Sequence, residues 1–247
     1  TPFIPAAKRM NAKIKRDIDP VNNDRITLIP QAMSIVADEV IDLHRQLVPY
    51  GYDEINVNLG CPSGTVVSKK RGSGILAYPD MLDSFLDELY TKADFPVSIK
   101  TRVGFNDDEL WPKLIEIYSK YPISELTVHP RVQKDFYKNT PRMNDFALAM
   151  QKINPDKTTL CYNGDITDTN SFNALTDCFP DIDEIMIGRG LFANPALIAE
   201  LKGISMDKAE LRERLKNWHD EILSGYLSIF SGEKDAMFRM KEIWADS

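Results

Sequence analysis

Runs of aliphatic and β-branched residues alternate with amphipathic stretches over most of this chain, and no other feature limits its fold as strongly. The runs predicted as buried strands are Arg25–Ile29, Glu54–Leu59, Pro96–Lys100, Glu125–His129, Thr159–Tyr162 and Asp183–Ile187. The stretches predicted as helices between them are Ser34–Val48, Asp80–Lys92, Asp107–Lys120, Asn144–Ile153 and Asp168–Phe179. Strands that alternate with helices form a parallel sheet, either a closed barrel or a doubly wound open sheet.

The number of strands favours a TIM-type (β/α)8 barrel, with one strand too few. Thr1–Ile4 has the pattern of the tail of one more strand, which makes seven. A closed barrel needs eight strands and about 250 residues, and this chain has 247. The chain also starts abruptly within an element. We therefore expect an α/β barrel that lacks its first strand, with a gap between the first and last strands.

The pattern changes after Gly203, where two helices follow without a strand between them. They are predicted over Asp207–Ser224 and Lys234–Trp244. Asp207 is a plausible N-cap, and Glu210 stands three residues later, as in a capping box. The large apolar residues Trp218, Ile222, Phe230, Phe238 and Trp244 are too many for a solvated tail. We expect a barrel over 1–203 and the start of an incomplete helical domain over 204–247.

Composition and charge exclude several classes of protein. No apolar run approaches the roughly 20 residues that span a bilayer, and no signal peptide is visible. The net charge of −7 argues against a nucleic-acid binder that is basic over its whole surface. Two local basic clusters remain, at Lys8–Arg16 and Lys69–Arg71, and by charge alone each reads as a solvated face. Three cysteines outside any metal-ligand spacing indicate a reducing cytoplasm and no metal site.

Polar and glycine-rich groups follow the predicted strands, at the end where barrels of this kind carry their chemistry. They are Gln31, Asn58–Cys61, Lys100, Arg102, His129, Arg131, Asn163–Asp165 and Gly188–Gly190. A structural barrel has no need of this enrichment. The last two groups suit a phosphate, since glycine lets the backbone approach an anion and Arg189 adds charge, although turns alone also use such glycines. Lys100 and His129 would point into the same mouth, and a fixed cation there suits a cofactor ring that becomes anionic on reduction.

The three cysteines have different expected roles. Cys61 follows a strand directly, between Gly60 and Pro62, and this tight turn would hold its thiol at the mouth of the barrel. A thiol is mostly protonated at neutral pH, so it can serve as an acid as well as a nucleophile. Cys161 and Cys178 lie inside a predicted strand and a predicted helix, and both are assigned to packing.

Five segments together resemble the tRNA-dihydrouridine synthase family of flavoproteins. They are Ile55–Ser63, Ile99–Gly104, Thr127–Arg131, Asn163–Asp165 and Met186–Gly190, in the order and spacing of that family. The resemblance covers about Arg25 to Leu201. Three features depart from the family: an opening A-P-M-x-G-V-T loop is absent, the C-terminal helical RNA-binding domain is present only in part, and Pro130 stands where many members have glycine.

The resemblance implies a cofactor, a reaction and a role for each site residue. FMN would be held by Gln31, Lys100, His129, Asn163, Gly164, Asp165, Gly188 and Arg189. NADPH would reduce the flavin, which would pass a hydride to C6 of a tRNA uracil. Cys61 would protonate C5, while Asn58 and Arg131 would hold the edge of the base. The basic clusters would then hold the tRNA backbone, and a monomer is expected.

Three other functions stay open at this point. The chain could be an FMN barrel that acts on a free pyrimidine, as dihydroorotate dehydrogenases do, although the basic clusters and trailing helices speak against a small substrate. It could be a flavin-free lyase or isomerase acting on a sugar phosphate. It could also be an inactive fragment that binds RNA.

Overall fold

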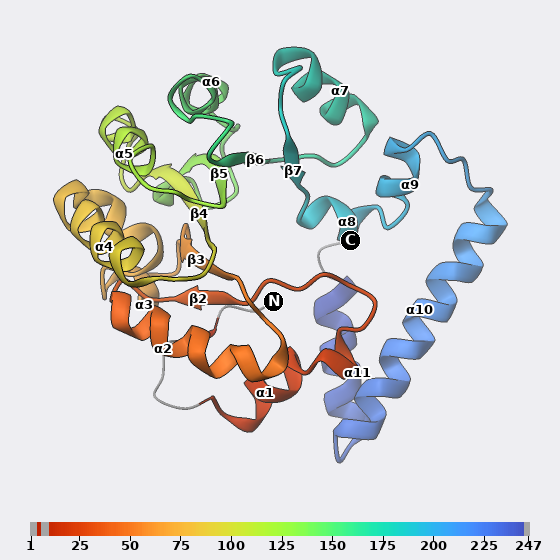
Figure 1. The fold of residues 1–247 in the computed structure, drawn as a ribbon. Helices are drawn as coiled ribbons and strands as arrows, with labels where there is room; N and C mark the ends of the chain where they lie inside the picture. Colours follow the sequence, from red (N-terminus) through yellow and green to blue (C-terminus); the bar gives the residue numbers. More distant parts are fainter. Residues whose placement is uncertain (1–3, 6–9, 245–247) are drawn as a thin grey trace. The chain divides into compact units, whose positions relative to one another are not determined.

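The computed structural model describes residues 4–5 and 10–244, and these residues form a parallel sheet with flanking helices (Figure 1). The sheet order follows the chain order from β1 to β7, and every neighbouring pair is parallel. The strands are β1 (Ile4–Pro5), β2 (Gln31–Met33), β3 (Ile55–Leu59), β4 (Val97–Gly104), β5 (Glu125–Val132), β6 (Thr159–Asn163) and β7 (Glu184–Met186). This is the strand order of a TIM-type barrel, which confirms the predicted fold class. Within the described residues there are seven strands, and β1 and β7 are the two edges of the sheet.

The described chain divides into two compact units. The first comprises the described residues up to 163 together with 182–186, and the second comprises residues 164–181 and 187–244. The helices of the first unit are α1 (Ala12–Ile18), α2 (Ala37–Leu47), α3 (Gly64–Val67), α4 (Pro79–Lys92), α5 (Trp111–Tyr118) and α6 (Met143–Lys152). Those of the second unit are α7 (Thr169–Cys178), α8 (Arg189–Ala193), α9 (Leu197–Leu201), α10 (Lys208–Ile229) and α11 (Glu233–Trp244).

The core of the first unit lies between the strands and the helices that cover them. Trp111, Tyr118 and Phe146 are fully buried there, together with the aliphatic residues of β3, β4 and β5. The helices α2, α4, α5 and α6 follow one another along the outer side of the sheet (Figure 1). Helix α4 shows why such segments are helical, since its buried residues recur at helical spacing on one face, at Leu82, Phe85, Leu86 and Leu89.

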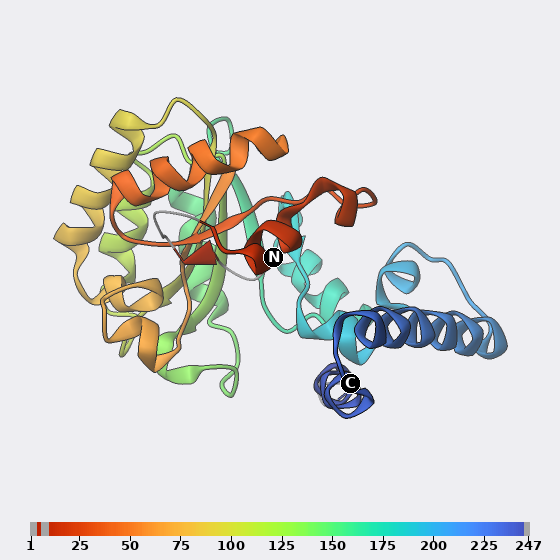
Figure 2. The same cartoon turned by 90° about the horizontal axis from the view of Figure 1, so that it is seen from below.

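In the second unit, α10 and α11 pack against each other (Figure 2). The side chain of Asp207 caps α10 by accepting hydrogen bonds from the backbone N–H groups of Ala209 and Glu210, as predicted. The predicted capping box is not completed, because the Glu210 carboxylate accepts from Arg214 instead. The helix also runs on to Ile229, beyond the predicted end at Ser224.

The predicted strand Arg25–Ile29 is wrong, and its position has shifted along the chain. Strand β2 begins at Gln31, after a proline that has no N–H to donate to a ladder. Ile26 is 61% exposed, whereas Ala32 and Met33 are buried in the sheet. The short apolar pattern of residues 25–29 therefore marks a surface segment, and Gln31 opens the strand instead of following it.

Strands β4 and β5 extend four and three residues beyond their predicted ends. The extended parts of the two strands pair with each other in the sheet, Arg102 with His129 and Gly104 with Val132. Lys100, Arg102, His129 and Arg131 consequently lie inside strands. Of the described helices, none is long and apolar enough to cross a membrane.

Candidate active site on the polar face of the sheet

The two faces of the sheet differ in chemistry because side chains alternate along each strand. Thr101 and Tyr162 point to the helices: the Thr101 hydroxyl lies 3.0 Å from the Tyr118 hydroxyl of α5, and the Tyr162 ring meets Phe146 of α6 edge-on. Lys100 and Cys161, next to them in sequence, point to the opposite face. This inner face carries polar side chains on several strands, among them Gln31, Asn56, Asn58, Ser98, Lys100, Arg102, Thr127, His129, Arg131 and Asn163.

Lys100 and Asn163, which the sequence placed at two strand ends, meet on this face. The Lys100 ammonium donates to Asn163 Oδ1 at 2.6 Å, and Asn163 Nδ2 donates to the Met186 carbonyl at 2.9 Å. Burial, with a smaller contribution from the Arg102 charge, lowers the pKa of Lys100 to about 8. The surroundings thus disfavour the ammonium form, and a ligand that brings negative charge to this point would stabilise it.

His129 and Arg131 lie side by side on β5. Arg131 Nη1 is 3.0 Å from His129 Nε2, and a guanidinium can only donate, so this nitrogen accepts and the imidazole proton sits on Nδ1. Arg131 Nε also donates to the Asn139 carbonyl, and the His129 ring stacks on Tyr137. Both residues are almost fully buried. The arrangement places the His129 imidazole beside a buried cation.

A chain of side-chain amides joins β2, β3 and β4. Gln31 Nε2 donates to Asn56 Oδ1 at 2.7 Å, and Asn58 Nδ2 donates to Gln31 Oε1 at 2.6 Å. Asn56 Nδ2 continues the chain to the Ser98 hydroxyl at 3.1 Å. Two of the predicted site residues, Gln31 and Asn58, are therefore in direct contact.

The loop that carries Cys61 follows β3 directly and is held from both sides. Asn58 Oδ1 accepts from the backbone N–H groups of Gly60 and Cys61, at 3.0 and 2.8 Å. The Cys61 carbonyl accepts from the backbone and the hydroxyl of Ser73. Gly72 approaches so closely, at φ +54°, that an added Cβ would lie 2.7 Å from the Cys61 carbonyl oxygen. The thiol is half-buried on a fixed loop, as its sequence position predicted.

The two remaining cysteines differ from each other. Cys161 lies inside the strand predicted for it and is buried on the inner face of the sheet. Cys178 is exposed at the end of α7, so its assignment to packing is wrong. The last residue of a helix is exposed to solvent unless another element covers it. No element of the described chain covers Cys178, and the apolar periodicity of the segment cannot predict this.

Arg102, Ser73 and Gln133 are site residues that the motifs did not single out for a role. Arg102 Nε donates to the Gly60 carbonyl at 3.0 Å, and Gln133 Nε2 donates to the Pro62 carbonyl at 2.9 Å. The sequence predicts Arg102 only as a polar residue near a strand end. Because side chains alternate between the two faces of a strand, its position two residues after Lys100 could have placed it on the same face.

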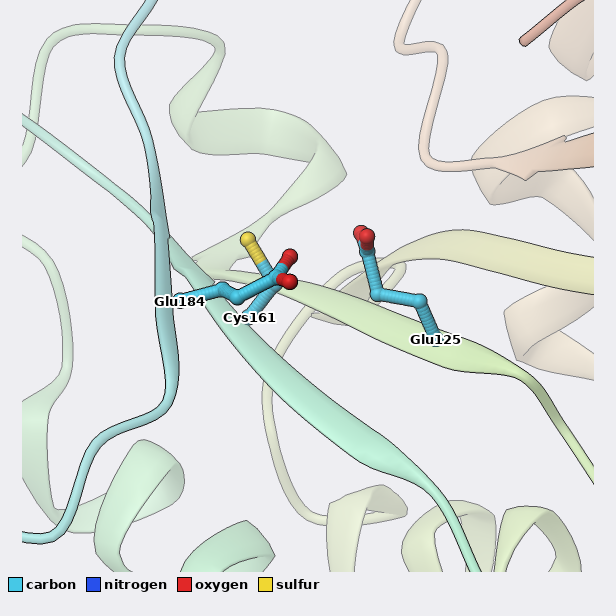
Figure 3. Close-up of side chains that lie close together, drawn as sticks. All are labelled: Glu125, Cys161 and Glu184. Atoms are coloured by element: carbon cyan, nitrogen blue, oxygen red, sulfur yellow. The ribbon is translucent and has the colours of Figure 1, made fainter.

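Glu125, Cys161 and Glu184 lie close together on the inner face, one from each of the neighbouring strands β5, β6 and β7 (Figure 3). Glu125 and Glu184 are the first residues of their strands. Their carboxylate and thiol atoms lie within 4.8 Å of one another. Burial raises the pKa of Glu125, and a hydrogen bond with Glu184 adds to this effect although Thr127 donates to Glu125. Burial and Glu125 raise the pKa of the Cys161 thiol to about 12. The Cys161 thiol beside these carboxylates therefore stays protonated at neutral pH.

Four of the predicted cofactor residues belong to the second unit. Arg189, at the start of α8, forms an ion pair with Asp165 at 3.0 Å. Gly164 precedes Asp165 in the same loop, and Gly188 is the N-cap of α8, with open space around its Cα. Gly190 has a packing role, because an added Cβ would lie 2.0 Å from the Ile166 carbonyl oxygen. The ion pair orients Arg189 and neutralises part of its charge.

Known proteins resemble this chain over most of its length. The family model described as dihydrouridine synthase (Dus) matches residues 2–236. A probable tRNA-dihydrouridine synthase of Staphylococcus aureus (strain N315) is 31% identical over 203 residues, which are 80% of this chain and 58% of that protein. The tRNA-dihydrouridine synthase B of Escherichia coli (strain K12) is 30% identical over 70% of this chain and 53% of its own length. The chain thus spans little more than half the length of these relatives.

Proposed function

Because the chain belongs to the dihydrouridine synthase family, we propose that it reduces uridine in tRNA to 5,6-dihydrouridine with FMN as its cofactor and NADPH as the reductant. The observation that carries the proposal is the Cys61 loop. A half-buried thiol is held at the end of β3 by two hydrogen bonds to Asn58, next to a face lined with buried polar groups. An acid in a fixed position beside a cofactor face is what reduction of a carbon–carbon double bond requires.

The residues of the polar face suit a flavin ring. Lys100 is a buried cation with a lowered pKa, so a ring that gains negative charge on reduction would stabilise its ammonium form. Gln31, Lys100, His129 and Asn163 would hold the ring. Gly164, Asp165, Gly188 and Arg189 would hold the remainder, where glycine backbone and a guanidinium suit a phosphate. Reduced FMN, when bound, would supply the hydride for C6 of the uracil.

The chain's own residues would complete the reaction. Hydride addition at C6 leaves negative charge on the base, and the Cys61 thiol would quench it by giving its proton to C5. Arg131 and Asn58 would hold the edge of the uracil. Asn58 Oδ1 accepts a hydrogen bond from the Cys61 N–H. A contact of Asn58 with the base would therefore link the position of the base to the position of the thiol.

Recognition of tRNA would depend on local positive charge. Lys13, Lys15 and Arg16 lie on the exposed α1, and Lys8 and Arg9 of the same cluster lie outside the described residues. In the second cluster, Arg71 pairs with Glu39 and Lys70 lies over the Tyr78 ring, which leaves Lys69 as its most available charge. Residues 204–247 would belong to a helical RNA-binding domain. The target base would have to leave its stack to reach the polar face.

The test is whether tRNA gains two hydrogens at a uridine. Purified protein with FMN and NADPH is incubated with tRNA from cells that lack the gene, and the tRNA is analysed by mass spectrometry after nuclease digestion. We expect one uridine position to be reduced, and the same position to be unreduced in the deletion strain. Reduction of a free pyrimidine instead of tRNA, or a purified protein that binds no flavin, would overturn the proposal.

A further inference from the structure

We propose that Arg102 is a positioning residue, which holds the Cys61 loop (60–63) and the loop at 132–137 together so that the thiol stays in place. This role rests on the proposed function, because it concerns the acid of that reaction. Arg102 itself does not take part in proton transfer. Its effect passes through the backbone of the two loops.

The side-chain hydrogen bonds of Arg102 all go to backbone carbonyl groups of these loops, and its guanidinium also lies over the Tyr137 ring. Nε donates to the Gly60 oxygen at 3.0 Å, Nη1 to the Val132 oxygen at 2.9 Å, and Nη2 to the Phe136 oxygen at 2.8 Å. The side chain is 2% exposed. One rigid guanidinium thus binds Gly60, the residue before Cys61, and also the carbonyl groups of Val132 and Phe136, which lie 30 and 34 positions after Arg102 in the sequence.

Arginine is the side chain that can do this. Its planar fork presents five donors in a fixed geometry, whereas lysine offers a single compact ammonium. Burial lowers the pKa of Arg102, so the protein stabilises this cation less than water does. A buried charge of this kind is costly unless its hydrogen bonds are made, and here three of them hold loops in register.

Both loops are in conformations that need such support. Phe136, whose carbonyl Arg102 binds, has a φ of +49°, which a bulky residue rarely adopts. The other loop is packed against Gly72 without room for a Cβ. Asn58, Ser73 and Gln133 make further bonds to the Cys61 loop, so loss of Arg102 would loosen it without unfolding the strand that carries it.

The experiment compares Arg102→Lys and Arg102→Gln with Arg45→Gln, a matched control at an exposed arginine of α2. Hydrogen exchange of the FMN-loaded protein is followed by mass spectrometry in peptides over 60–72 and 132–139, with helix α4, which buries one face, as internal reference. The alkylation rate of Cys61 is measured in a Cys178→Ser background. Dihydrouridine formation is measured by single turnover with prereduced protein.

We expect faster exchange in both loops and no change in α4. We expect Cys61 alkylation to accelerate about tenfold, since the thiol is half-buried when the loop is held. Product formation should fall by about 10²-fold with unchanged FMN content, which is typical for small displacements of a reacting group. Arg102→Lys should behave like Arg102→Gln, and Arg45→Gln like the parent protein.

Three results would overturn the proposal. Exchange that is unchanged in either loop would show that Arg102 does not hold it. Exchange that rises equally in α4 would show a general effect on stability. A lysine variant that behaves like the parent would show that charge alone suffices. If the parent protein makes no dihydrouridine, the proposed function fails, while exchange and alkylation still decide whether Arg102 holds the loops.

Discussion

At the scale of single residues, position on the inner or outer face of the sheet decides what each side chain can do. Lys100 and Thr101 are neighbours in sequence, yet Thr101 contacts a helix and Lys100 reaches across the inner face to Asn163. The same alternation sets Cys161 apart from Tyr162, which packs on Phe146. Chemistry and stability are thus divided between alternate residues of one strand.

Replacement of Cys61 by alanine should separate cofactor chemistry from product formation. We expect flavin content and NADPH oxidation to stay nearly unchanged, because neither uses the thiol. Dihydrouridine formation should fall by about 10²–10⁴-fold, the usual effect of a positioned acid. Single-turnover reduction of tRNA by prereduced protein measures this, and Cys161→Ala and Cys178→Ala are the controls. Product formed at the parent rate would place the acid elsewhere.

Replacement of Lys100 by alanine should weaken FMN binding. One charge-assisted hydrogen bond contributes about 1.5–3 kcal/mol, which corresponds to a rise in the dissociation constant of roughly 10- to 100-fold. Quenching of flavin fluorescence during titration of the apoprotein measures the constant. Lys113→Ala, on the exposed side of α5, is the control. An unchanged constant together with an unchanged rate of flavin reduction would remove Lys100 from the cofactor site.

At the scale of elements, the loops after β4 and β5 are held together by charged side chains. Asp135 accepts from the Val132 N–H at 3.0 Å and forms an ion pair with Arg142, which also contacts Asp108 at 3.4 Å. Burial opposes ionisation of Asp135, but its hydrogen bonds with Arg142 and Asn139 outweigh this and lower its pKa. The loop beside the polar face therefore depends on an ionised Asp135, and it should weaken in acid as this group is protonated.

Asp145, in the first turn of α6, has the opposite behaviour. Its Oδ2 is the one buried side-chain oxygen or nitrogen in the described part of the chain that has no hydrogen-bond partner. Burial, and then the nearby Asp108, raise the pKa of Asp145 to about 6, although a helix N-terminus favours a carboxylate. The native state thus prefers the neutral form, and the stability that Asp145 contributes in acid is lost as the pH rises through about 6.

Asp145→Asn should therefore stabilise the protein in a pH-dependent way. At pH 8 the variant avoids a buried charge, and we expect a gain on the order of 1 kcal/mol after allowance for partial solvent exposure. At pH 4.5 the native carboxyl is neutral and only its ionisation in the unfolded chain still favours unfolding, so the gain should be markedly smaller. Thermal unfolding at the two pH values measures the difference. A gain of equal size at both values would show that hydrogen bonding, and not ionisation, is its cause.

At the scale of the whole molecule, the sheet brings segments far apart in sequence onto one polar face. Lys100 meets Asn163, and Glu125 meets Glu184, only because β4 to β7 pair in order. The net charge of the whole chain does not predict the local charge of each surface. A chain of charge −7 carries basic side chains gathered on α1 that suit an RNA backbone.

Charge reversal on α1 should weaken tRNA binding in a salt-dependent way. The double variant Lys13→Glu, Lys15→Glu should bind tRNA less tightly at low salt. The negative slope of the logarithm of the association constant against the logarithm of salt concentration should become shallower by about two. Filter binding over a range of salt concentrations measures the slope. The matched control is Lys113→Glu on α5 together with Lys120→Glu in the turn after it, which should leave the slope unchanged. Equal losses in both variants would show a general charge effect instead of a site on α1.

The sequence by itself determined the alternation of elements, the parallel sheet with its strands β3 to β7, and most residues of the inner face. These follow from local periodicity, which depends on neighbours a few positions away. The strand at residues 25–29 failed for the same reason, because a short apolar run does not say whether another element covers it. The Cys61 loop was visible because Gly60 and Pro62 flank the thiol in sequence.

Only the tertiary structure decided how far β4 and β5 extend and what holds the Cys61 loop. A strand continues as long as its neighbour supplies a ladder, so Gly104 ends β4 opposite Val132. Arg102, Ser73 and Gln133 reach the loop over 42, 12 and 71 positions of sequence. Their bonds depend on where backbone carbonyl groups come to lie after folding, which no local pattern of residues encodes.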